Sequence, residues 1–134
     1  DLQRFAEAIN NKVWSATRTD MAMIGGITNG KKAMDLSDIG GLYCEIMSWG
    51  YTLVSVANLH LMLSSNNCSF YEQPLPYETF EFGMHDVLRT NKDGYMYAPT
   101  KPGLGVEINW DQMKTRVIHS FYCDKNKEVG LVHV

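Results

Sequence analysis

The hydrophobic pattern at the start of the chain repeats at the spacing of a helix. Four apolar residues fall on one face of such a helix: Leu2, Phe5, Ala6 and Ile9. Polar residues occupy most of the positions between them, which is typical of an amphipathic helix with one buried side. The pattern predicts a helix over residues 1–11. Because this helix begins at Asp1 without a cap or a leader segment, we expect that further chain precedes it.

Short apolar runs and helical patterns alternate over the following part of the chain. Runs rich in strand-forming residues predict three short strands, over residues 13–17, 42–47 and 68–72. Between them, the apolar spacing predicts two helices, over residues 28–39 with Thr28 as N-terminal cap, and over residues 53–63. Alternating strands and helices indicate βαβ units with a parallel sheet, so we predict the α/β fold class.

The second part of the chain has a different character, which divides the sequence into residues 1–76 and residues 77–134. Prolines and glycines punctuate the region from residue 73 to 108 and favour loops over regular elements. The sequence Asn91-Lys92-Asp93-Gly94 predicts a turn between short strands around residues 87–89 and 95–97. A short helix is predicted from its cap Asn109 to about residue 118, whereas the tail from Phe121 onward shows no clear pattern.

Composition and charge exclude several classes of protein. The chain has 134 residues, of which 45% are hydrophobic and 20% are charged, with a formal net charge of -3. These values suit a single globular domain and exclude an intrinsically disordered chain. No cluster of Lys and Arg supplies the dense positive face that phosphate binding needs, so we expect no nucleic-acid partner. Polar residues such as Asn58 and His60 interrupt the uncharged stretch 46–63, so we expect buried interior and no membrane partner.

The cysteines indicate the compartment. Three cysteines, Cys44, Cys68 and Cys123, form neither a disulfide framework nor a CxxC metal cage. A reducing, cytoplasmic location is therefore expected. The sequence Asn67-Cys68-Ser69 matches a glycosylation sequon, but we expect it to be unused because no signal peptide accompanies it.

Several motifs give the chain a resemblance to a known family. The run Asp20-Met21-Ala22-Met23-Ile24-Gly25-Gly26-Ile27-Thr28 resembles the sixth-strand segment of the mandelate racemase/muconate lactonizing enzyme branch of the enolase superfamily. The run from Pro102 to Asp111 resembles the C-terminal signature of that family, a Pro-Gly-Leu-Gly-Val turn followed by a short acidic helix. Three shorter motifs lie between them in the expected order: Ser48-Trp49-Gly50, Ala57-Asn58-Leu59-His60-Leu61 and Tyr71-Glu72-Gln73-Pro74.

The resemblance implies that this chain is the C-terminal part of a (β/α)8-type barrel. A complete barrel needs about 250 residues, so a chain of this length supplies only about three βα units. On this interpretation residues 1–76 form strands six to eight of the family barrel. Residues 77–134 form a loop-rich segment that returns to an α+β capping domain.

Three residues are predicted at the carboxyl ends of strands, where barrel enzymes place their chemistry. The resemblance implies that Asp20 orients a His on the next strand and raises its basicity, and it implies that Glu72 hydrogen-bonds the carboxylate of the substrate. The alternatives are that Asp20 is only a turn or cap residue and that Glu72 is a solvated residue before Gln73.

Met47 stands where the family pattern leads us to expect a His. A thioether cannot accept or deliver a proton at neutral pH, so two-base racemisation is not expected of this site. Met47, Ser48 and Trp49 are instead predicted to line the substrate pocket. The alternative is that Met47 is a core residue and that Trp49 packs in the interior. His60 is predicted to be a hydrogen-bonded helix residue rather than a displaced base.

The resemblance also implies a function for the parent protein. We expect a Mg2+-dependent enzyme that removes the proton α to the carboxylate of a sugar acid, either as a dehydratase (a lyase) or as a cycloisomerase (an isomerase). The Mg2+ ligands and the lysine base are expected upstream, with no metal ligand in this chain, and the isolated chain is expected to be inactive.

The alternative is a non-catalytic fragment or module that needs the remainder of the barrel, or a second chain, to complete its sheet. The expected partners are thus a small-molecule carboxylate substrate and the missing barrel strands. Homo-oligomers are expected by analogy with the family.

Overall fold

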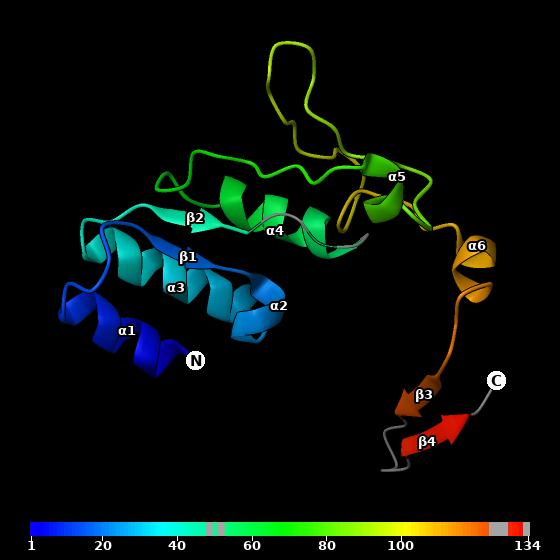
Figure 1. Ribbon diagram of the computed structural model, residues 1–134, viewed down its shortest axis with the longest axis horizontal. Coiled ribbons are helices and arrows are strands. Elements are labelled where there is room, and N and C mark those ends of the chain that lie inside the picture. Colours follow the sequence, from blue (N-terminus) through cyan, green and yellow to red (C-terminus); the bar gives the residue numbers. More distant parts are fainter. Residues whose placement is uncertain (48–49, 51–52, 124–128, 133–134) are drawn as a thin grey trace.

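The structure is a computed structural model that describes residues 1–47, 50, 53–123 and 129–132. The predicted pocket residues Ser48 and Trp49 lie outside these described residues. Figure 1 shows helices packed on a pair of strands at one end, a C-terminal segment that runs away from this body, and a separate hairpin near the C-terminus.

The first part of the chain alternates helices with two parallel strands. Its elements are α1 (Leu2–Asn10), β1 (Thr17–Thr19), α2 (Met21–Ile24), α3 (Ile27–Ile39), β2 (Cys44–Ile46) and α4 (Leu53–Leu63). β1 and β2 pair in parallel, with Thr17 opposite Cys44 and Thr19 opposite Ile46. The predicted helices over residues 1–11 and 53–63 are confirmed, as is the parallel arrangement.

The predicted strand over residues 13–17 is wrong, because β1 begins only at Thr17. After α1 the chain turns at Lys12, whose φ is 53°, and the backbone N–H of Val13 donates to Ala8 at 3.1 Å. The ring of Trp14 then packs against Phe5 with 5.5 Å between the ring centroids. This run therefore turns back toward α1, where Trp14 contacts Phe5, instead of entering the sheet.

The helix predicted from Thr28 begins one residue earlier, and its cap is Gly26, which has no side chain. Gly25 and Gly26 both have positive φ angles, of 95° and 103°. Such angles are strained for other residues, and here they let α2 end and α3 start within two residues. Asn29 stabilises the junction, since its Nδ2 donates to the Ile24 carbonyl at 3.1 Å.

The predicted third strand over residues 68–72 is also wrong, since this segment lies beside β2 without forming a ladder. The backbone N–H of Phe70 donates to the Glu45 carboxylate at 3.3 Å, and the Ser69 hydroxyl donates to the same carboxylate at 3.2 Å. A side chain of β2 thus takes up bonds that a strand would make to the backbone.

The core lies between the strands and the helices. It contains Phe5 from α1, Ala33 and Met34 from α3, Cys44 and Ile46 from β2, and Leu61 and Met62 from α4. Thr17 and Thr19 are buried on this side of β1, whereas Arg18 between them is exposed. Strand alternation therefore places Arg18 on the sheet face opposite the core.

The sequon at Asn67 is buried in this body. Asn67 is 7% exposed, and its Nδ2 donates to the carbonyl oxygens of Met34 at 3.0 Å and Leu42 at 3.3 Å. This burial supports the expectation that the sequon is unused. In the part of the chain that the structure describes, we find no helix with both the length and the apolar character needed to cross a membrane.

The second part of the chain contains the helices α5 (Tyr77–Phe80) and α6 (Trp110–Lys114) and the antiparallel strands β3 (Ser120–Cys123) and β4 (Val129–Val132). The strands predicted over residues 87–89 and 95–97 are wrong, although the turn between them is present. Asn91 Oδ1 there accepts the backbone N–H groups of Asp93 at 3.0 Å and Tyr95 at 2.8 Å. Asn109 caps α6 as predicted, accepting the Gln112 N–H at 2.9 Å, but the helix ends early.

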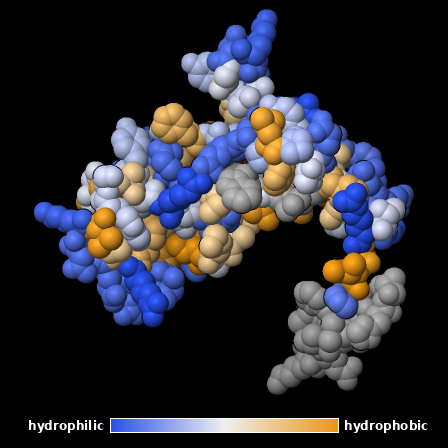
Figure 2. All heavy atoms as spheres, in the orientation of Figure 1, coloured by the Kyte–Doolittle hydropathy of each residue, from blue (hydrophilic) through white to orange (hydrophobic). Residues whose placement is uncertain are grey.

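Figure 2 shows that the projecting loop around the Asn91 turn is mostly hydrophilic. Figure 2 also shows an apolar patch where the chain leads toward the β3–β4 hairpin. Ile118, two residues before β3, is 78% exposed. The tail, in which the sequence shows no clear pattern, forms the antiparallel β3–β4 hairpin in the structure.

Candidate active site

Asp20 is placed by the junction between β1 and α2. It follows the last residue of β1 with extended backbone angles, φ −140° and ψ 135°, and it is the N-terminal cap of α2. Its Oδ1 accepts the backbone N–H of Ala22 at 2.6 Å, and the residue is 7% exposed. The predicted strand-end position is confirmed. The capping role is also present, so the carboxylate is held in one orientation at this edge of the sheet.

Met47 occupies the corresponding position after β2. Its backbone N–H donates to the Thr19 carbonyl at 2.8 Å, which extends the pairing of the two strands by one bond. Its carbonyl oxygen accepts a hydrogen bond from Asn58 Nδ2 at 2.8 Å. Met47 is half-buried, so the structure places it at the strand end rather than deep in the core.

Asp20 and Met47 line one open hollow of about 330 Å³ at the carboxyl ends of the strands. Arg18 and Phe5 also line it, together with residues of α2. The hollow therefore combines two acidic residues, Asp1 and Asp20, with one guanidinium and an apolar wall. Such a set can hold a small polar anion, because the guanidinium offers paired N–H donors to a carboxylate.

Glu72 lies outside a regular strand but is joined to this hollow by an ion pair. Its Oε1 accepts a charge-assisted hydrogen bond from Arg18 Nη2, with side chains that are 33% and 49% exposed respectively. The structure thus brings Asp20 and Met47 together directly and connects Glu72 through Arg18. The contacts of Glu45 with residues 68–70 hold the segment that carries Glu72.

The sequence interpretation missed Arg18 and Asn58. A signal for Arg18 was available, because Arg18 and Asp20 are two residues apart on an extended segment and so share one face. A signal for Asn58 was also available, since Asn is unusual in the middle of a nearly apolar helix. Its two hydrogen-bond partners could not be predicted from spacing.

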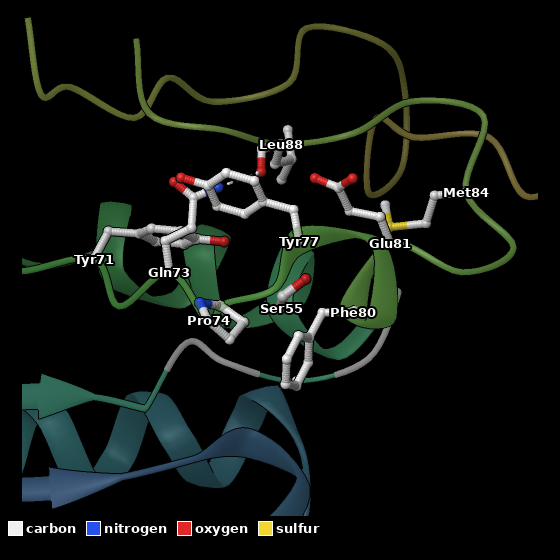
Figure 3. A pocket seen from close by; sticks show the side chains of 10 residues that line it. Ser55, Tyr71, Gln73, Pro74, Tyr77, Phe80, Glu81, Met84 and Leu88 are labelled. Atoms are coloured by element: carbon white, nitrogen blue, oxygen red, sulfur yellow. Dashed lines mark hydrogen bonds between the residues drawn. The ribbon is translucent and has the colours of Figure 1, made fainter. Parts of the chain in front are cut away.

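A second cavity of about 30 Å³ lies where residues 71–88 fold over the start of α4. Figure 3 shows the side chains of Tyr71, Gln73 and Tyr77 grouped at one end of it. Gln73 Nε2 donates to the Leu88 carbonyl at 3.1 Å, and its Oε1 accepts the Thr90 N–H at 3.0 Å. This cavity has room for about one water molecule, so we assign it to fixing the C-terminal segment and not to binding a substrate.

His60 is hydrogen-bonded, as predicted for a helix histidine. Its Nε2 lies 3.0 Å from the Leu104 carbonyl oxygen, which belongs to the glycine-rich signature. Gly105 in that signature has φ 77°, and a Cβ there would stand 2.4 Å from Pro99 Cβ. The signature therefore forms a tight turn that docks on α4 through His60.

The described residues do not fit a Mg2+ site. None of their His, Cys, Asp and Glu side chains form a group of three that could hold a metal ion. Mg2+ requires near-octahedral oxygen ligands, whereas the hollow presents only two acidic residues, Asp1 and Asp20, beside a guanidinium. A cation in the hollow would also be repelled by Arg18.

Comparison with known families gives a match over most of the chain. The family model described as enolase C-terminal domain-like matches residues 1–112. A D-galactonate dehydratase family member, RspA of Pantoea ananatis, is 36% identical over 110 residues, covering 75% of this chain and 24% of that protein. A second member, from Musicola paradisiaca, is 32% identical over 118 residues, covering 81% of this chain and 26% of the relative. The chain therefore spans about a quarter of the length of these curated relatives.

Solved structures show the same fold. A protein from Pseudovibrio sp., described as a mandelate racemase/muconate lactonizing enzyme, has a TM-score of 0.83 and 43% identity, covering 86% of this chain and 31% of that one. D-glucarate dehydratase from Agrobacterium tumefaciens, crystallised with magnesium, has a TM-score of 0.71 and 28% identity, covering 84% of this chain and 30% of that one. An enolase from Pantoea ananatis with bound D-gluconate and Mg has a TM-score of 0.69 and 28% identity, covering 86% and 28%.

Proposed function

This chain belongs to the enolase C-terminal domain-like family, in the mandelate racemase/muconate lactonizing enzyme branch of the enolase superfamily, and we propose on that basis that it forms part of a sugar-acid dehydratase. The fold is the α/β C-terminal part of a barrel, as the resemblance implied. Relatives in the D-galactonate dehydratase family and the D-glucarate dehydratase structure support this reaction class. Cycloisomerisation remains the second reaction that one-base chemistry allows.

The observation that carries the proposal is the shared hollow of Asp20, Arg18 and Met47 at the carboxyl ends of two parallel strands. Removing the proton α to a carboxylate creates a second negative charge on the substrate, which needs preorganised donors and cations. Arg18 supplies such a cation and donor, and its pair with Glu72 fixes the direction of the guanidinium.

The residues of this chain assist the reaction from one side of the substrate. The α-proton passes to a base on another part of the barrel, the C–O bond to the β-hydroxyl breaks, and that oxygen leaves as water after protonation. The enol that remains becomes a keto acid. Met47 presents no base to the opposite face, so inversion at the α-carbon is not expected.

We include Mg2+ in the proposal as a cofactor bound by parts of the barrel outside the described residues. The relatives crystallised with magnesium support it. When bound, the ion would neutralise charge that develops on the carboxylate of the substrate. In this chain, Asp20 and Arg18 would orient the substrate beside it.

The division of the chain follows from the same proposal. Residues 1–76 would supply strands six to eight of the barrel, with residues 68–72 taking the place of the last strand. Residues 77–134 would return to the capping domain. A cytoplasmic homo-oligomer is proposed by analogy with the family.

A second candidate function is a non-catalytic module that needs a partner chain. The two-stranded β1–β2 sheet favours it, because so small a sheet leaves strand edges to be paired. A size measurement tests this need for a partner: a folded 134-residue monomer at micromolar concentration would contradict it.

The experiment is an assay of the complete protein that contains this chain, with Mg2+, on D-galactonate, D-glucarate and D-gluconate. We expect a keto-acid product from at least one sugar acid and exchange of its α-proton with solvent. Arg18→Gln should lower kcat/KM at least about tenfold. Lys31→Gln, which removes an exposed cation from α3, is the matched control. Neither product nor exchange on any of the three acids would overturn the proposal.

A further inference from the structure

An asparagine in the middle of α4 is completely buried. Asn58 is 0% exposed, although Asn is a weak helix former and the helix around it is nearly apolar. A buried amide costs free energy unless its donor and acceptor groups are hydrogen-bonded. Its place among apolar neighbours therefore indicates a specific task.

Both ends of the Asn58 amide bind backbone groups beyond the carboxyl ends of the two strands. Nδ2 donates to the Met47 carbonyl oxygen at 2.8 Å, just after β2. Oδ1 accepts the backbone N–H of Met21 at 3.0 Å, which is the residue after Asp20. One side chain of α4 thus holds the exits of β1 and β2 together.

The bonds around Asn58 leave little freedom for the two residues of the hollow. Met47 also donates its N–H to Thr19 at 2.8 Å, so both of its backbone polar groups are fixed. Asp20 accepts the Ala22 N–H at the start of α2, while Asn58 takes the N–H of the residue between them. The capping of α2 is therefore shared between Asp20 and Asn58.

We propose that Asn58 is a positioning residue that sets the separation and orientation of Asp20 and Met47 across the hollow. It acts through backbone hydrogen bonds and does not line the hollow itself. This inference rests on the proposed function of the same site, because it assigns Asn58 to that chemistry.

Two substitutions separate positioning from packing. Asn58→Leu has a similar volume and removes both hydrogen bonds. Asn58→Asp is nearly isosteric: its protonated form can donate to Met47 and accept from Met21, whereas its ionised form has no donor for the Met47 carbonyl. Lowering the pH should therefore restore the missing hydrogen-bond donor in Asn58→Asp.

Asn67→Asp is the matched control. Asn67 is also buried, and its side chain also donates to two backbone carbonyls, but its backbone carbonyl oxygen accepts the Cys44 N–H at the beginning of β2. The same chemical change there disturbs the opposite end of the strand. We expect it to lower stability without changing the catalytic pH profile.

The first measurement is kcat/KM against pH in the complete protein with the sugar acid that it turns over. We expect Asn58→Leu to lose at least about tenfold at every pH. The deficit of Asn58→Asp relative to wild type should shrink as pH falls, because protonation restores the donor. If Asn58→Leu does not fold, this pH-dependent ratio still decides the question, with folding checked by circular dichroism at each pH.

The second measurement needs no substrate. Asn58→Leu should speed hydrogen exchange at the Met21 amide at least about tenfold more than its loss of global stability explains, whereas Asn67→Asp should change that amide only by its loss of global stability. If wild type turns over no sugar acid but exchange responds in this way, the proposed function fails while the positioning of the strand exits stands. If wild type is active and both Asn58 variants match Asn67→Asp in pH profile and exchange, the inference is overturned.

Discussion

Arg18 and Glu72 form an ion pair across 54 positions of the sequence, and it joins the exposed face of β1 to the segment that replaces a third strand. Because both side chains are partly exposed, solvent screens their attraction. The pair is therefore better suited to orienting the Arg18 guanidinium than to stabilising the fold.

A double-mutant cycle with Arg18→Gln and Glu72→Gln should confirm this division of roles. We expect a coupling free energy of unfolding below about 1 kcal/mol, measured by urea denaturation, because exposed pairs contribute little. The exposed Lys31–Asp35 pair of α3 serves as a reference of similar exposure. A coupling above about 2 kcal/mol would show that the pair is mainly structural.

Asp20 combines a capping bond with a place in the hollow, and two substitutions should separate these roles. Asp20→Asn keeps an oxygen that can accept the Ala22 N–H, so we expect stability within about 0.5 kcal/mol of wild type. Asp20→Ala loses the cap and should cost about 1 kcal/mol. Both should lower kcat/KM of the complete protein at least about tenfold. Full activity of Asp20→Asn would contradict a role of the Asp20 carboxylate in the reaction and would leave Asp20 only as the cap of α2.

The fold of the first part could be predicted where the signal was local. The apolar spacing of α1 and α4 is strong, and both helices lie within a residue or two of their predicted bounds. The predicted third strand is absent because the backbone N–H of Phe70 donates to a side chain, the carboxylate of Glu45, and not to the backbone of β2. When a side chain takes the place of a neighbouring strand as hydrogen-bond partner, the sequence of residues 68–72 itself gives no sign of it.

The candidate site was predictable in part for the same reason. Asp20 and Met47 follow β1 and β2 directly, and the parallel register brings such positions side by side. Arg18 was missed, although it shares one face of the extended segment with Asp20. Its link to Glu72 depends on how two distant segments pack, which no spacing in the sequence encodes.

The thiol of Cys68 should make stability depend on pH in the alkaline range. Burial raises the pKa of Cys68 from 9.0 to about 11, opposed by a bond from the Ile46 backbone. The folded state therefore keeps a proton that the unfolded state loses, so this contribution is complete below pH 9 and is lost as pH rises from 9 toward 11. Urea unfolding across this range should show a decline that Cys68→Ala reduces. An unchanged decline in Cys68→Ala would contradict the assignment.

The contact between α3 and α4 depends on the missing side chain of Gly30. A Cβ at Gly30 would stand 2.5 Å from Leu61 Cδ2, and Leu61 is only 1% exposed, so its side chain has little room to move. Gly30→Ala should therefore destabilise by about 1–2 kcal/mol in urea denaturation, because overpacking outweighs the gain of about 1 kcal/mol in helix propensity. Thr28→Ala, on an exposed position of α3, should stay within about 0.5 kcal/mol of the wild-type free energy of unfolding.

Leu61→Ala should cost less stability in the Gly30→Ala background than in wild type, since the new methyl group fills part of the cavity. A Gly30→Ala variant more stable than wild type would show that Leu61 can yield and that the close approach is not required.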